Sequence, residues 1–102
     1  MQFICIGDED TARGFRLAGI IAIAVTTADQ ARAILEDAAA SPDCGIIIIT
    51  EKAAAMIRQE VDAIRLERDR PLIVEIPGPE GPMTGRKSLR EFVQEAVGMR
   101  IG

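Results

Sequence analysis

The sequence has 102 residues, of which 48% are apolar and 27% charged, with a net charge of −4 and no histidine. This length suits one domain with a modest core, and the composition is that of a folded protein, not a disordered or membrane-spanning one. The negative charge argues against broad nucleic-acid binding, which needs clustered Lys and Arg. No apolar run approaches the ~20 residues that span a bilayer, and no export signal is evident, so we expect a cytoplasmic protein without direct membrane insertion.

The chain begins with a strand pattern followed by a short helix pattern. The apolar run "QFICI" (Gln2–Ile6) predicts a buried strand. Asp8 or Asp10 can cap the helix that follows, and Gly19 ends it. A second β-branched run, Ile20–Val25, predicts the next strand.

The middle of the chain repeats this alternation. Thr27 and Gln30 have the spacing of a capping box, which predicts a helix that Ser41 and Pro42 terminate. The run "CGIIII" (Cys44–Ile49) is apolar on both faces, as expected of a central parallel strand. The two cysteines, of which the other is Cys5, lack C-x-x-C spacing and are expected to be buried and reduced.

One more helix and one more strand complete the pattern. Thr50 can cap a helix whose apolar residues Ile57, Val61 and Ile64 share one face. Pro71 then precedes a strand from about Leu72 to Ile76. Four alternations with short connections predict an α/β fold: a four-stranded parallel sheet in the order 2-1-3-4, Rossmann- or receiver-like, with helices on both faces.

Ligands of such sheets bind outside the carboxyl ends of the strands, so any active site must lie there. These positions carry neither a G-x-G-x-x-G nor a P-loop motif, and the absence of histidine removes the commonest general base. We therefore expect no catalytic residues, no metal and no cofactor. The positions concerned are Gly7–Asp10, Thr26–Thr27, Thr50–Lys52 and Pro77–Gly81.

An acidic trio after the first strand leaves an alternative open. Asp8, Glu9 and Asp10 resemble the magnesium-binding acids of receiver domains, which would make the chain a phosphoacceptor. However, Thr50 stands where a receiver carries its phosphorylated Asp. The acids otherwise serve to cap a helix N-terminus.

The last part of the chain forms an amphipathic pattern without an obvious place in the sheet. Ser88 and Glu91 have capping-box spacing, so a C-terminal helix is expected over 88–102. Its apolar stripe needs a partner: either the free sheet face of its own domain or another protein, as in an adaptor. The stripe consists of Leu89, Phe92, Val93, Ala96 and Val97.

A Pro/Gly-rich segment connects this helix to the sheet. Proline stiffens the connection and glycine permits turns, so residues 77–87 are predicted to be a hinge between a sheet domain (1–76) and a tethered docking helix. Its breakers are Pro77, Gly78, Pro79, Gly81, Pro82 and Gly85.

Four stretches in order carry a family resemblance: "IGDEDTARGFRLAGI", "GIIIITEKAA", "PLIVEIPGPEGP" and "SLREFVQEAVG". Together they resemble the F subunits of the V/A-type ATPases, from end to end of the chain. That resemblance implies a non-catalytic central-stalk subunit in the soluble sector, peripheral to the membrane. Its implied partners are the coiled coil of the D subunit, the A/B catalytic ring and the other central-stalk subunits.

The resemblance also implies which residues bind the shaft. The family's C-terminal segment is associated with shaft binding and, by changing position, with modulating ATPase activity. Carried onto this chain, the contact residues are Leu89, Phe92, Val93, Ala96 and Val97, with Arg90 and Glu91 at the rim. Phe15 and Arg16, in the matching "GFRLAG" segment, are further candidates with only a packing reason of their own.

Overall fold

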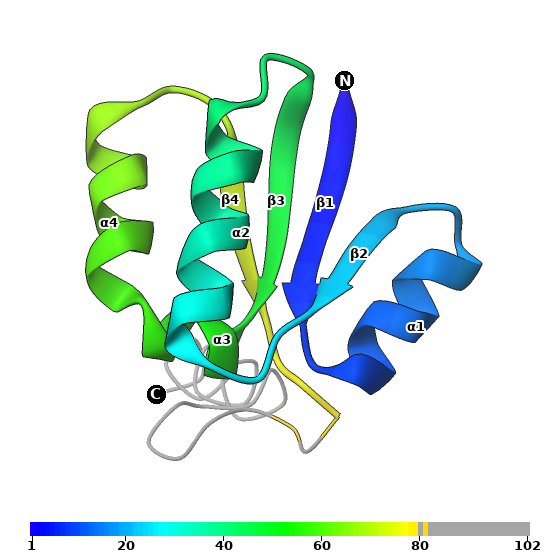
Figure 1. The fold of residues 1–102 in the computed structure, drawn as a ribbon. Coiled ribbons are helices and arrows are strands. Elements are labelled where there is room, and N and C mark those ends of the chain that lie inside the picture. Colours follow the sequence, from blue (N-terminus) through cyan, green and yellow to red (C-terminus); the bar gives the residue numbers. More distant parts are fainter. Residues whose placement is uncertain (80, 82–102) are drawn as a thin grey trace, which may run out of the picture.

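The computed structural model describes residues 1–79 and 81, and these form a four-stranded sheet with helices on both faces (Figure 1). Within this part, no helix has the length and hydropathy needed to cross a bilayer. The elements in chain order are β1 (Gln2–Gly7), α1 (Glu9–Leu17), β2 (Ile21–Ala24), α2 (Ala28–Ala40), β3 (Cys44–Thr50), α3 (Glu51–Met56), α4 (Arg58–Glu67) and β4 (Leu72–Ile76).

The sheet confirms the predicted topology. Its strands are ordered β2-β1-β3-β4 and every pairing is parallel. The carboxyl ends of all four strands therefore lie at the same end of the sheet. Within the described part of the chain, β2 and β4 each have a strand neighbour on one side only.

Hydrogen-bonding side chains begin three of the helices as their sequences suggest. Asp8 caps α1, Thr27 caps α2 and Thr50 caps α3, each accepting a hydrogen bond from the backbone three residues later. The predicted capping box of α2 forms only in part, because Gln30 Oε1 accepts from the N–H of Thr26 instead of that of Thr27. Gly19 adopts φ +86 just after α1, as expected of a residue that ends a helix.

The single helix predicted after β3 is in fact two helices. They are broken at Ile57, whose φ of −133 and ψ of 41 lie outside the helical region. Ile57 is 1% exposed and packs in the same apolar core as Ala53 and Val61. Periodicity could not reveal this break, because the spacing of buried residues from Ala53 through Ile57 to Val61 is the same as in a continuous helix.

Two apolar cores lie on opposite faces of the sheet. The larger lies between the sheet and α2, α3 and α4 (Figure 1). In it, isoleucines of β1 and β3 meet Leu35 and Val61. The smaller lies beneath α1, which packs over β1 and β2, and includes Cys5 and Ala12. These buried apolar side chains supply the main driving force for folding.

Both cysteines are free and buried, which confirms their prediction as buried thiols. Burial, helped by the nearby charge of Asp8, raises the pKa of Cys5 to about 11. Burial likewise raises the pKa of Cys44 above its ordinary value. Both groups are therefore protonated and unreactive near neutral pH.

Two glycines predict opposite responses to alanine. A Cβ on Gly7 would lie 2.7 Å from Cγ2 of the buried Thr50, so Gly7→Ala should lower the free energy of unfolding by about 1–3 kcal/mol. Gly14 lies inside α1 with open space around it, so Gly14→Ala should raise it by about 0.5–1 kcal/mol. Urea unfolding of the two variants checks both signs, and equal shifts would contradict the packing argument.

Candidate functional site

Two of the three acidic residues after β1, Asp8 and Glu9, are engaged in local structure. Asp8 accepts hydrogen bonds from Thr11 N (3.0 Å) and Thr11 Oγ1 (2.6 Å). Burial alone would raise the pKa of Asp8, but these hydrogen bonds outweigh it and lower the pKa. Glu9 forms ion pairs with Arg13 and Arg16 on its own helix. Asp8 and Glu9 thus serve α1 itself.

The carboxyl end of β3 is similarly occupied. Thr50 is 2% exposed, and its hydroxyl accepts from Ala53 N at 3.2 Å to begin α3. The position that a receiver uses for its phosphoacceptor is therefore a buried helix cap here. Among the residues that the structure describes, no group of three or more His, Cys, Asp or Glu is placed to hold a metal.

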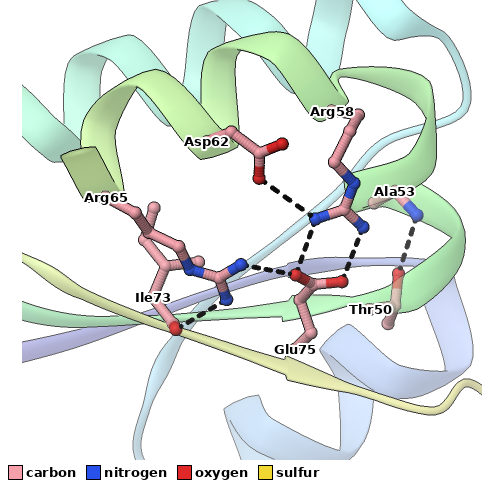
Figure 2. A network of polar contacts seen from close by, with 7 residues as sticks. All are labelled: Thr50, Ala53, Arg58, Asp62, Arg65, Ile73 and Glu75. Atoms are coloured by element: carbon pink, nitrogen blue, oxygen red, sulfur yellow. Dashed lines mark hydrogen bonds and ion pairs between the residues drawn. The ribbon is translucent and has the colours of Figure 1, made fainter.

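An arginine clamp at the end of β4 was not predicted from the sequence. Arg58 donates to both carboxylate oxygens of Glu75, at 2.8 and 2.7 Å, and Arg65 donates to one of them at 2.8 Å (Figure 2). Asp62 lies 3.6 Å from Arg58. The Glu75 side chain is only 10% exposed. This clamp joins α4 to β4 at the position just before the strand ends.

A sequence signal for this clamp exists in retrospect. Glu75 is a charged residue in the otherwise apolar strand "LIVEI", and a buried carboxylate requires partners. Arg58 and Arg65 are seven residues apart in the preceding helix, so they lie on the same face two turns apart. Together these two observations point to the contact.

The contacts of Glu75 predict how the free energy of unfolding changes as the pH falls. The hydrogen bonds from Arg58, and the single one from Arg65, lower the pKa of Glu75 from its ordinary 4.5 to about 2, against the opposing effect of burial. Because the folded-state pKa is the lower one, its stabilisation is complete above pH ~4.5 and is lost as the pH falls from there through 2. The expected loss is about 3 kcal/mol in urea unfolding across this range. Glu75→Gln should remove that part of the dependence, and an unchanged profile would contradict the assignment.

The sheet face that α1 shares is only partly covered by described elements. Register places Phe3, Ile46 and Leu72 side by side on this face, and Ile48 beside Val74 two residues further along. Phe3 and Val74 are each 39% exposed and Leu72 is 59% exposed. We call this apolar surface the open sheet face; its exposed residues are Phe3, Leu72 and Val74, and beside them lie the half-buried Ile46, Ile48 and Ile76, of which Ile48 also packs against the smaller core.

The predicted hinge begins where β4 ends. Gly81 N donates to Gly78 O at 3.0 Å, and Gly81 has φ +91, so the chain turns immediately after the strand. A Cβ on Gly78 would lie 3.8 Å from Asp8 Oδ1, which places this turn beside the start of α1. The described hinge residues are Pro77, Gly78, Pro79 and Gly81.

The remaining predicted binding and hinge residues lie outside the described part of the chain. They are Pro82, Gly85, Leu89, Arg90, Glu91, Phe92, Val93, Ala96 and Val97. Of the two further candidates, Phe15 packs half-buried in the smaller core, and Arg16 Nε donates to Ala22 O at 2.9 Å. Both therefore have a role inside the domain.

Comparison with known proteins assigns the chain to a family. Residues 3–93 match the family model of the ATP synthase (F/14-kDa) subunit. The chain is 36% identical to the A-type ATP synthase F subunits of Pyrococcus abyssi and of Thermococcus kodakarensis, over 99% of this chain and 98% of each relative. It is 31% identical to the corresponding F subunit of Methanococcus maripaludis over 99% of both chains. The chain therefore belongs to the family of ATP synthase (F/14-kDa) subunits.

Proposed function

We propose that this chain is a non-catalytic central-stalk subunit of a V/A-type rotary ATPase. In this role it binds the coiled-coil shaft formed by the D subunit. It either couples ATP hydrolysis or synthesis to ion transport or regulates that process. The A/B catalytic ring and the other stalk subunits are its further partners. The chain would work in the cytoplasm, as part of the soluble sector and peripheral to the membrane.

The open sheet face is the observation that carries this proposal. A stalk subunit acts through protein interfaces, and an exposed apolar surface of contiguous side chains is a common mark of such an interface. The C-terminal stripe predicted from the sequence would supply a second apolar surface, in the helix-to-helix manner that a coiled-coil shaft allows. Family membership and near-complete coverage of relatives named as F subunits support the same role.

The receiver-like alternative gains no support from the geometry. Asp8 and Glu9 are held by partners on α1, and Thr50 caps α3 from a buried position. A phosphoacceptor would need an accessible carboxylate at that strand end. Incubation with a small phosphodonor is accordingly expected to yield no phosphoprotein.

Reconstitution with the purified D subunit tests the proposal directly. The two proteins, mixed at micromolar concentration, should co-elute from a sizing column as a stable 1:1 complex. Failure to co-elute would refute the stalk assignment. A free-standing adaptor would instead bind an unrelated protein in the absence of every ATPase subunit.

A further inference from the structure

The two outer strands of the sheet, β2 and β4, are open to pairing with another extended chain. In the part of the chain that the structure describes, β2 and β4 each lack a strand neighbour on one side, so some of their backbone N–H and C=O groups face outward without a strand partner. Such an edge is a template onto which another extended chain can add. The shortness of β2, with four residues, reduces this risk only in part.

An arginine reaches a backbone carbonyl on each of these edge strands. Arg16 Nε donates to Ala22 O on β2 at 2.9 Å, and an Arg65 Nη donates to Ile73 O on β4 at 3.0 Å. Each arginine comes from the helix that precedes its strand in the chain, although α1 and α4 lie on opposite faces of the sheet. Each guanidinium therefore reaches its edge from a different direction.

Both guanidinium groups are also fixed by a carboxylate. Glu9 accepts from Arg16 at 3.2 Å, and Glu75 accepts from Arg65 at 2.8 Å. The arginine side chains remain 46% and 38% exposed, so their charge faces water. Among the described residues, two hydrogen bonds run from a guanidinium to the backbone carbonyl of a strand. In both, the carbonyl belongs to an edge strand.

We propose that Arg16 and Arg65 guard the two edges of the sheet against strand addition by a second copy of this chain. An incoming strand would have to displace the guanidinium from its carbonyl and desolvate a charge beside the new ladder. Both steps oppose pairing. With strand addition opposed at both edges, the sheet domain would bind partners through side-chain surfaces such as the open sheet face.

Matched arginine variants of the full-length chain separate this role from simple stability. Arg65→Met removes the carbonyl contact, whereas Arg58→Met breaks a bidentate pair with the same Glu75 and leaves Ile73 O covered. On the other edge, Arg16→Met is matched by Arg13→Met, because Arg13 pairs with the same Glu9 at 3.9 Å. If Arg65→Met does not fold, the β2 pair of variants carries the test alone.

Self-association is measured by analytical ultracentrifugation, at matched fractions of folded protein. Arg16→Met and Arg65→Met are each expected to self-associate about tenfold more tightly than the matched control, because a carbonyl that lacks its donor becomes available to an incoming strand. Hydrogen exchange in the oligomer should show new protection at the corresponding edge strand. The proposal would be overturned if Arg16→Met and Arg65→Met associated no more tightly than their controls. It would also be overturned if their oligomers showed no new hydrogen-exchange protection at the edge strand.

Discussion

Replacing Phe92 with Asp is expected to weaken binding to the D subunit by at least about 30-fold, which corresponds to ~2 kcal/mol. Phe92 is the largest side chain of the predicted apolar stripe, and a carboxylate at that position would have to be desolvated without a partner. Isothermal titration of the variant against the D subunit measures the loss.

The control for this prediction places the same charge off the stripe. Gln94→Asp should leave the affinity for the D subunit nearly unchanged, since position 94 falls between the apolar residues of the helical pattern. The thermal stability of the free chain must be measured beside each titration. A loss of stability in free Phe92→Asp equal to its loss of affinity would show that the stripe packs on its own domain, and would count against the docking proposal.

Replacing Glu75 with Gln is expected to lower the free energy of unfolding by about 2–3 kcal/mol. The substitution keeps the shape of the side chain but removes the charge that holds Arg58 and Arg65. Hydrogen bonds to charged groups are worth about 1.5–3 kcal/mol, and Glu75 is nearly buried while the arginines can partly return to water. For a domain of this size the melting temperature should fall by about 10 °C or more.

Asp62→Asn is the matched control for Glu75→Gln. Asp62 contacts the same Arg58 but is 52% exposed, so its loss should change the free energy of unfolding by no more than about 0.5 kcal/mol. If Asp62→Asn were as damaging as Glu75→Gln, the clamp would owe its effect to charge balance on α4 and not to the buried carboxylate of β4.

The fold was largely predictable because its signals are local and repeated. Apolar runs marked all four strands, and Thr27 and Thr50 marked the starts of two helices. For the first helix the sequence offered Asp8 or Asp10 as the cap, and the structure shows Asp8. Strand order followed from the short connections between alternating elements. What failed was the continuity of the third helix, since Ile57 keeps the apolar spacing while its backbone leaves the helical region.

The surfaces were less predictable than the fold, because contacts between distant residues leave weak traces in a sequence. The Glu75 clamp joins residues 10 and 17 positions apart, and nothing local to any one of them requires it. The open sheet face depends on strand register and on which helix covers which strand, neither of which periodicity alone supplies. The C-terminal binding residues, from Leu89 to Val97, stay predictions.

The position of β4 has a mechanical consequence. β4 is paired with β3 over all five of its residues, so a pull on the chain just after Ile76 acts on this pairing. A pull along the strand axis shears every ladder bond together, whereas a sideways pull opens them one after another. Glu75, fastened to α4 one residue before the exit, adds a cross-tie at the point where the load arrives. Resistance to a sustained pull at this point is therefore set by how fast β4 detaches.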